Sequence, residues 1–323
     1  MRVVNWNKTN DYVNVFWAQN IAQMWTETEF PVVKDSRSWD SLTEAERTVY
    51  KRVLAGLTGL DTHQATEGMP LIALHIGDDR KRAVLSFMSA MEHIHAKSYS
   101  YIFTNLLPSS ETDYLLEKWA PSQPQLIKKA TIISRYYRKL IAEKPSAYDV
   151  YMACVASVLL ESYLFYSGFY YPLYLAGQGK MAASGEIIRK ILIDESIHGV
   201  FVGYIAQELR AQLTPDDLEW AAYETTELLH VLHANETEYT REIYGGLGGE
   251  IVDDVLRYVE YNANKALANL GLDPAFEPQQ FSAIVENGLD TGTKHHDFFS
   301  TKGDGYVMAL NVEPMTDADF IFA

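Results

Sequence analysis

Two Glu-x-x-His motifs occur at distant points of this sequence. Glu92 and His95 lie in MEHIHAKSYSYIF, and Glu195 and His198 lie in ILIDESIHGVF. Residues three apart share one face of a helix, so each motif directs a carboxylate and an imidazole toward the same point. Such mixed oxygen and nitrogen ligands suit iron or manganese, and the absence of thiolates argues against structural zinc. Either motif alone occurs often by chance.

Two further acids interrupt apolar helical segments. Asp61 follows VLAGLTGL, and Glu161 follows VASVLL. Taken singly, Asp61 could be a hydrogen-bonded acid and Glu161 the partner of a buried arginine. Burying four carboxylates without counter-charge is prohibitive, however, and these segments offer few lysines or arginines. Two Glu-x-x-His pairs and one carboxylate from each of two other helices are typical of di-iron and di-manganese bundles. We therefore predict a carboxylate-bridged dinuclear metal site with the ligands Asp61, Glu92, His95, Glu161, Glu195 and His198.

Tyr99 lies four residues after His95, on the same side of the predicted helix. Phe165 and Phe169 are four and eight residues after Glu161, and Ile191 is four before Glu195. This spacing predicts a dry, unreactive pocket around the phenol, which would protect a one-electron-oxidised tyrosine. Ordinary core packing explains the same spacing equally well, since aromatic residues make up 12% of the chain.

The elements that must position these residues are helices. Pro, Gly and turn clusters separate long segments with helical periodicity, and alternating strand patterns are scarce. Ser41, with Glu44 three residues later, is a candidate N-cap and capping box. His63, His75 and His93 are expected to be solvent-facing or capping residues. The other expected helices cover residues 10–26, 80–106, 111–118, 122–142, 147–176, 183–209, 214–243 and 249–270. The last 40 residues lack periodicity and predict an extended, flexible tail.

Composition limits the class of protein. The 323 residues carry a formal net charge of −16, which argues against non-specific nucleic-acid binding. The single cysteine, Cys154, excludes an internal disulfide and fits a reducing cytoplasm. Residues 150–177 are apolar enough to suggest a membrane helix, but Glu161 lies near their centre. We expect no membrane span there, and a helix buried on all sides instead.

In combination, these segments resemble the small, radical-generating subunit of class I ribonucleotide reductase, most closely the bacterial class Ib type. LTGLDTHQATEGMP, MEHIHAKSYSYIF, VASVLLESYLFYSGFYYPLYLAG and RKILIDESIHGVFVGY match its ligand segments in order and spacing. The resemblance covers essentially the whole chain. It implies an all-α, ferritin-like helical bundle over residues 1–285, and a C-terminal tail over 286–323 that binds the large subunit.

The resemblance also implies roles for single residues. Asp61, Glu92 and His95 would bind the metal nearer the tyrosine, and Glu161, Glu195 and His198 the other. Tyr99 would carry the radical. Three residues would transfer it: Trp25 in MWTETEF, Asp194 as the acid that links Trp25 to His95, and Tyr306 in KGDGYV as the tail relay.

The function implied is that of the small subunit of ribonucleoside-diphosphate reductase. A dimanganese or diiron cluster would oxidise Tyr99 to a stable tyrosyl radical. The large catalytic subunit would use that radical to reduce ribonucleotides to deoxyribonucleotides for DNA replication. The resemblance further implies a homodimer, a flavodoxin-like activator that supplies superoxide to manganese, and docking of the tail through Phe320 and Phe322. A dimetal oxidase or oxygenase of the same fold, and a ferritin-like storage protein, are the alternatives.

Overall fold

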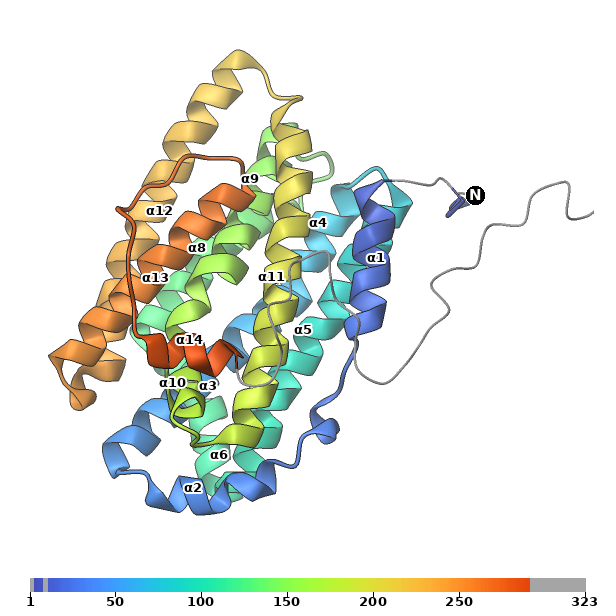
Figure 1. The fold of residues 1–323 in the computed structure, drawn as a ribbon. Coiled ribbons are helices and arrows are strands. Elements are labelled where there is room, and N and C mark those ends of the chain that lie inside the picture. Colours follow the sequence, from blue (N-terminus) through green and yellow to red (C-terminus); the bar gives the residue numbers. More distant parts are fainter. Residues whose placement is uncertain (1–2, 8–10, 291–323) are drawn as a thin grey trace, which may run out of the picture. The chain divides into compact units, whose positions relative to one another are not determined.

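The structure, a computed structural model, describes residues 3–7 and 11–290 (Figure 1). Every regular element in this part of the chain is helical, which confirms the predicted all-α class. Tyr306, Phe320 and Phe322 lie outside the described residues. The longer helices are α1 (Tyr12–Gln23), α3 (Glu44–His63), α5 (Asp79–Leu106), α8 (Pro124–Lys139), α9 (Ala147–Leu159), α10 (Tyr166–Gly177), α11 (Ala182–Arg210), α12 (Pro215–Tyr244) and α13 (Gly249–Asn269).

Shorter helical elements connect the long ones. Four are α-helices of eight residues or fewer before α9: α2 (Ser36–Ser41), α4 (Met69–His75), α6 (Ser109–Tyr114) and α7 (Ala120–Ser122). Three are π-helical turns: η3 (Gln64–Gly68), η4 (Leu115–Trp119) and η5 (Leu160–Leu164). Three are 3₁₀ turns: η1 (Glu27–Glu29), η2 (Val32–Asp35) and η6 (Gly245–Leu247). α14 (Ala283–Asp290) is the last described element.

The start of α3 differs from the sequence prediction. Thr43 is the N-cap: its hydroxyl accepts from the Glu46 backbone N–H at 3.3 Å, and its own N–H donates to the Glu46 carboxylate at 2.7 Å. The predicted cap Ser41 is wrong, because Ser41 ends α2 and donates to the Ser38 carbonyl oxygen. Both Ser41–Glu44 and Thr43–Glu46 fit the capping-box pattern, so the pattern alone could not choose between them.

The apolar segment near residue 160 is the centre of the bundle. One helix was predicted over 147–176, but the π turn η5 separates α9 from α10 at Glu161. Ala147–Gly177 is long and apolar enough to cross a membrane, yet its most apolar window is completely buried by the rest of the protein. Its hydrophobicity therefore serves the core of the fold.

The elements that carry the predicted ligands pack against one another. α3 lies against α5, α5 against α11, and α11 against both α9 and η5 (Figure 1). A distant residue fixes the start of α11: Asp35 accepts hydrogen bonds from the backbone N–H groups of Ala183 at 3.0 Å and Ser184 at 2.7 Å. A carboxylate at this position satisfies N–H groups that the first helical turn leaves free.

α14 packs on α10 and crosses the predicted domain boundary at residue 286. The contact is close. A Cβ at Gly177 would collide with the Ile284 carbonyl oxygen, and one at Gly288 with the Leu173 carbonyl oxygen. The division of the chain at residues 285 and 286 stays a prediction.

A second close approach, between α11 and α13, gives a test of the packing. A Cβ at Gly203 would collide with the carbonyl oxygen of Asn269. We expect Gly203→Ala to lower the free energy of unfolding by about 1–3 kcal/mol, the usual cost of overpacking a tight core. Urea denaturation of the purified protein measures this change.

The same substitution in an open place is the control. A Cβ at Gly59, in α3, would meet nothing within 4 Å. Gly59→Ala should therefore raise the free energy of unfolding by about 0.5–1 kcal/mol, since alanine loses less backbone entropy in a helix. Equal effects of the two substitutions would contradict the tight α11–α13 contact.

Candidate metal centre

The structure brings all six predicted metal ligands together inside the bundle. α3 contributes the first, α5 the next pair, η5 one more and α11 the last pair. Each side chain is completely buried, with 0% of its surface exposed. The set is Asp61, Glu92, His95, Glu161, Glu195 and His198.

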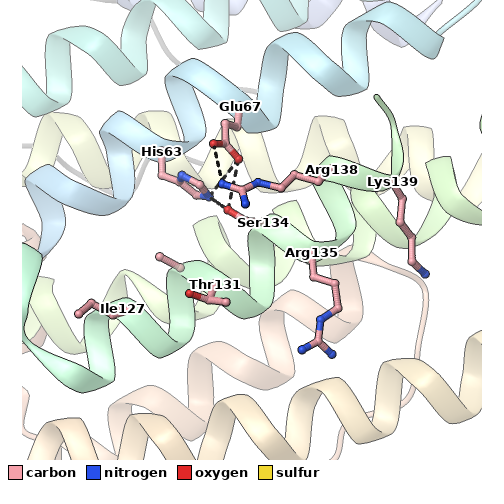
Figure 2. Close-up of a pocket in the computed structure, with 9 residues that line it drawn as sticks. His63, Glu67, Ile127, Thr131, Ser134, Arg135, Arg138 and Lys139 are labelled. Carbon is pink, nitrogen blue, oxygen red and sulfur yellow. Dashed lines mark hydrogen bonds and ion pairs between the residues drawn. The ribbon is translucent and has the colours of Figure 1, made fainter. Parts of the chain in front are cut away.

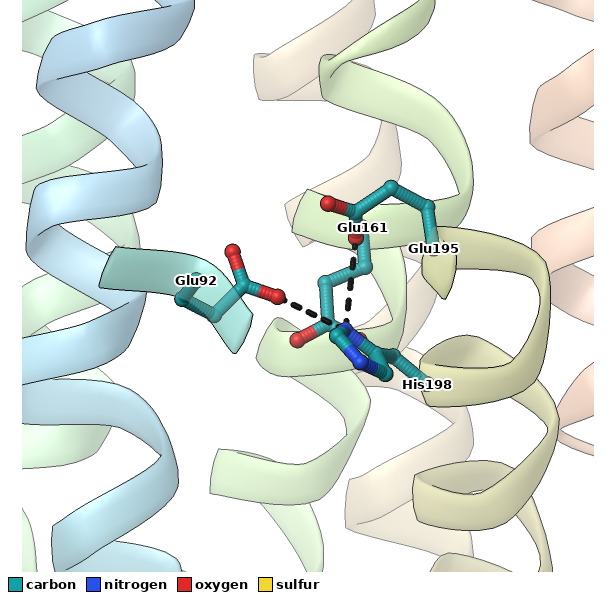
Figure 3. Close-up of side chains that lie close together, drawn as sticks. All are labelled: Glu92, Glu161, Glu195 and His198. Carbon is teal, nitrogen blue, oxygen red and sulfur yellow. Dashed lines mark ion pairs between the residues drawn. The ribbon is translucent and has the colours of Figure 1, made fainter. Parts of the chain in front are cut away.

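The ligand atoms fall into two overlapping groups. One group consists of Asp61, Glu92 and His95, and the other adds Glu161, Glu195 and His198 to the same Glu92. Within each group, one oxygen or nitrogen atom from every residue lies within 4.8 Å of the others. Figure 3 shows the second group, in which the carboxylates of α5, η5 and α11 converge on the imidazole. Because Glu92 belongs to both groups, two ions held here would be neighbours.

The two glutamates of the motifs lie between the two imidazoles. His198 Nδ1 is 2.7 Å from the Glu92 carboxylate of the other helix, and His95 Nδ1 is 3.0 Å from that of Glu195. Within each motif the corresponding distance is 3.7 Å. Glu92, which belongs to both ligand groups, would therefore contact both ions, and Glu195 also lies close to the opposite imidazole.

The donor set fits metal ions because many of its atoms lack hydrogen-bond partners. Buried atoms without a hydrogen-bond partner among the described residues are common around this cluster: both oxygens of Asp61, Glu92 and Glu195, one of Glu161, and both ring nitrogens of His198. Unpaired buried polar atoms are costly and rare. Their concentration around one point fits a pair of cations, which would satisfy them together.

The closely spaced carboxylates and imidazoles shift one another's pKa values. Burial, followed by repulsion from neighbouring carboxylates, raises the pKa of Asp61 well above its usual value. Burial alone would lower the pKa of His95 and His198, but the carboxylates close to each ring raise both pKa values well above the usual value. Burial opposes ionisation of Glu92, yet the nearby imidazoles of His198 and His95 lower its pKa to about 2. Cations that bind here therefore compete with protons.

Tyr99 is completely buried beside this cluster. Its phenol lies next to the Asp61 carboxylate. Burial first, and then the negative charges of Asp61 and Glu195, raise the pKa of Tyr99 well above its usual value. The phenol is therefore neutral at physiological pH, so that removing an electron from it must also release its proton.

The three residues predicted to surround Tyr99 are also completely buried. Phe165, Phe169 and Ile191 each expose 0% of their surface. The two phenylalanine rings pack edge to face with centroids 6.1 Å apart. That these side chains form the pocket of Tyr99 stays a prediction.

A hydrogen-bonded path leads from the cluster to Trp25. The indole N–H of Trp25 donates to Asp194 Oδ2 at 2.7 Å, and the same oxygen is 2.9 Å from His95 Nε2. The indole ring also stacks on the His95 ring, with centroids 6.0 Å apart and 18° between the planes. Trp25 is only 2% exposed. The structure thus joins the residues that the resemblance connected.

Comparison with known proteins gives the family. The sequence profile of the family "Ribonucleotide reductase, small chain" matches residues 3–282. This chain belongs to that family. The small chain is 47% identical over 320 residues to the ribonucleoside-diphosphate reductase subunit beta of Bacillus subtilis, covering 98% of this chain and 95% of that protein. It is 36% identical over 323 residues to the ribonucleoside-diphosphate reductase 2 subunit beta of Escherichia coli, covering 99% of this chain and 98% of that protein.

A solved structure agrees with this assignment. The small chain is similar to dimanganese(II)-NrdF of Streptococcus sanguinis, with a TM-score of 0.83 and 37% sequence identity over 90% of this chain and 99% of that one. Another relative, subunit beta nrdF1 of Mycobacterium tuberculosis, is 42% identical over 328 residues. These findings confirm the class Ib resemblance and the helical-bundle fold. The small chain is a subunit of ribonucleoside-diphosphate reductase, an oxidoreductase.

Three residues beside the ligands, Gln64, Ser157 and Tyr137, were not predicted from the sequence. Gln64 donates from its amide nitrogen to the Glu161 carboxylate and to Ser157 Oγ, and it accepts from the Tyr137 hydroxyl at 2.6 Å. The spacing offered one signal, because Gln64 follows Asp61 by three residues and so shares its helical face. Tyr137 on α8 offered none.

A separate surface pocket lies between α8 and the end of α3. Its volume is about 740 Å³. Figure 2 shows the His63 ring directed at Ser134, whose hydroxyl also donates to Glu67 at 3.2 Å, while Arg138 forms an ion pair with Glu67. His63 was expected to face solvent or to cap a helix, but it is half-buried and hydrogen-bonded. None of the six metal-ligand candidates lines this pocket.

Proposed function

We propose that this small chain holds a dinuclear manganese or iron centre and uses it to generate a tyrosyl radical on Tyr99. The observation that carries the proposal is the pair of overlapping ligand groups, completely buried and adjacent to a buried phenol. Asp61, Glu92 and His95 hold one ion, and Glu161, Glu195 and His198 hold the other. Glu92 would contact both ions, because it belongs to both ligand groups. The Streptococcus sanguinis relative is a dimanganese(II) protein, which supports manganese, rather than iron alone, as a metal that this centre can use.

The protein's residues control the oxidation of the phenol. When bound and oxidised by oxygen or superoxide, the metal ions would supply the one-electron oxidising equivalent. Tyr99 gives up one electron and its O–H proton, and Asp61 is the adjacent group that can accept the proton. Complete burial keeps water and reductants away from the resulting radical. Phe165, Phe169 and Ile191 complete that apolar surrounding.

Trp25 and Asp194 provide a route for the radical out of the bundle. The indole touches His95 by stacking and Asp194 by its N–H, so an electron and a proton can move together along this path. The radical then reaches the large subunit, where the ribonucleotide is reduced. Tyr306 in the tail is the proposed last relay on this chain.

Trp25→Phe tests this route. We expect the radical on Tyr99 to form in normal yield, because phenylalanine preserves the buried stack on His95. Ribonucleotide reduction with the large subunit should fall roughly 10²-fold, since phenylalanine can neither donate to Asp194 nor be oxidised comparably. Parallel measurements of radical spin concentration and turnover give the answer, and unchanged turnover would exclude Trp25 from the route.

The proposed partners follow the family. The name "subunit beta" of the relatives supports a complex with a large subunit, and we propose that the tail of residues 286–323 binds it through Phe320 and Phe322. A homodimer, a flavodoxin-like activator that delivers superoxide to a manganese centre, and a cytoplasmic location complete the proposal. The alternative of a dimetal oxidase or oxygenase has no support among the relatives described above.

Reconstitution tests the proposed function. The full-length chain is loaded with Mn(II) or Fe(II) and exposed to oxygen or to superoxide. The expected result is two ions per chain and a tyrosyl paramagnetic signal, with ribonucleotide reduction once the large subunit is added. A protein that binds two ions but develops no tyrosyl signal with any combination of metal and oxidant would contradict the radical role.

A further inference from the structure

Gln64 is the central residue of a buried hydrogen-bond network, and one of its partners is the metal-ligand candidate Glu161. Gln64, Ser157 and Glu161 are completely buried, and so is Tyr137. They come from η3, α9, η5 and α8, four elements that pack together around the cluster. Gln64 contacts the cluster through its hydrogen bond to the Glu161 carboxylate.

The orientation of the Gln64 amide is fixed at both ends. The two N–H bonds of its NH₂ group can serve Glu161 Oε1 and Ser157 Oγ, the latter at 2.8 Å. Its carbonyl oxygen accepts from the Tyr137 hydroxyl at 2.6 Å. A flipped amide would face an oxygen with an oxygen at Glu161 and would leave the Tyr137 hydroxyl facing an NH₂ group. Only one orientation therefore satisfies all three partners.

The backbone makes room for this amide. A Cβ at Gly68, the last residue of η3, would collide with the Gln64 carboxamide and would lie 2.9 Å from the Tyr137 ring. Glycine at this position therefore leaves the space that the Gln64 carboxamide occupies next to Tyr137. The π turn itself inserts a residue into the helix after Asp61, and such turns recur at functional sites.

The consequence for Glu161 is an asymmetric carboxylate. Gln64 holds Oε1, whereas Oε2 has no hydrogen-bond partner among the described residues. We propose that Gln64, held by Tyr137 and Ser157, is a positioning residue that fixes the Glu161 carboxylate toward the ion shared with His198. This inference rests on the proposed function, because it takes Glu161 to be a metal ligand.

Loss of Gln64 should weaken metal binding at only one of the two positions. Partners that orient metal ligands typically contribute 10- to 100-fold to affinity. Gln64→Leu replaces the amide with an apolar side chain of comparable volume that, like glutamine, is not branched at Cβ, and it removes all three hydrogen bonds. We expect it to weaken the Glu161–His198 position for Mn(II) about tenfold and to leave the Asp61–His95 position unchanged. A general loss of stability would weaken both positions.

Mn(II) titration of the full-length metal-free chain, with free Mn(II) followed by its paramagnetic signal, measures the two affinities. Glu161→Ala identifies which step of the isotherm belongs to the Glu161 position. Co(II) loading adds a second readout, because its visible absorption reports the ligand arrangement and should change in Gln64→Leu at that position only. Thermal unfolding of each metal-free variant establishes that it is folded.

Two tyrosine variants make the test specific. Tyr137→Phe removes the hydroxyl that orients Gln64 and should weaken the same position in the same direction, by less than Gln64→Leu. Tyr170→Phe is the matched control: like Tyr137→Phe, it removes a buried hydroxyl that donates a hydrogen bond at 2.6 Å, but the acceptor is Asp254, which is not one of the metal-ligand candidates. Tyr170→Phe should leave both Mn(II) affinities unchanged.

The outcomes separate this inference from the proposed function. If Glu161→Ala binds two Mn(II) ions as tightly as the wild type, Glu161 is no ligand, and the proposed metal centre fails together with the inference. If Glu161→Ala loses one ion while folded Gln64→Leu retains both wild-type affinities and the wild-type Co(II) spectrum, the positioning role of Gln64 alone is overturned.

Discussion

Replacing Tyr99 with phenylalanine should eliminate the tyrosyl radical while both metal ions still bind. The hydroxyl of Tyr99 is the only part removed, and all six ligand candidates are retained. Phenylalanine has no O–H to release to Asp61, so it cannot form the neutral radical. Ribonucleotide reduction with the large subunit should drop roughly 10³-fold or more, as expected when the residue that carries a chemical step is lost.

The control for this experiment is another buried phenol. Tyr163 is completely buried, and its hydroxyl also lacks a hydrogen-bond partner among the described residues. Tyr163→Phe removes the same atoms from the same kind of surroundings and should preserve both the signal and turnover. The radical assignment is refuted if Tyr99→Phe, loaded with two ions and oxidised, gives the same paramagnetic signal as the wild type.

Glu92→Ala should abolish the binding of both metal ions, the second large effect that the geometry predicts. Glu92 belongs to both ligand groups, and its carboxylate is 2.7 Å from His198 Nδ1 and 3.7 Å from His95 Nδ1. Its loss therefore removes an anionic ligand from each ion. The number of Mn(II) ions bound per chain should fall from two in the wild type to none at concentrations that saturate the wild type.

Comparison with Glu161→Ala shows that the effect depends on the shared position of Glu92. Glu161 belongs to one group only, so its removal should leave one ion bound to Asp61, Glu92 and His95. Metal-induced stabilisation gives an independent measurement. Free metal at 1,000 times the dissociation constant stabilises the folded state by about 4 kcal/mol per site. The wild type should gain from two sites, Glu161→Ala from one, and Glu92→Ala from neither.

A different ranking of the metal-binding losses of these variants would indicate that another carboxylate is the shared ligand. If Glu92→Ala retained one ion while Glu195→Ala lost both, Glu195 would be the shared ligand. The 3.0 Å approach of Glu195 to His95 Nδ1 shows that this carboxylate also reaches the opposite imidazole. Equilibrium dialysis with metal analysis distinguishes the cases.

The sequence by itself determined the side chains from which the site is built. The three-residue spacing of each Glu-x-x-His motif is a property of one helix, and helical periodicity is local. Asp61 and Glu161 could be recognised because an unpaired acid in an apolar helix needs a partner. The all-α class followed from the same periodicity, which the described residues confirm.

Only the tertiary structure decided how these side chains meet. That Glu92 faces His198, and Glu195 faces His95, depends on the packing of α5 against α11, which no spacing along one helix encodes. The hydrogen bond between Gln64 and Tyr137 likewise joins two residues that are 73 positions apart in the sequence. The π turn at Glu161 and the cap at Thr43 were not predicted, since a local pattern permits several backbone solutions. Burial and the packing of neighbouring helices select one of them.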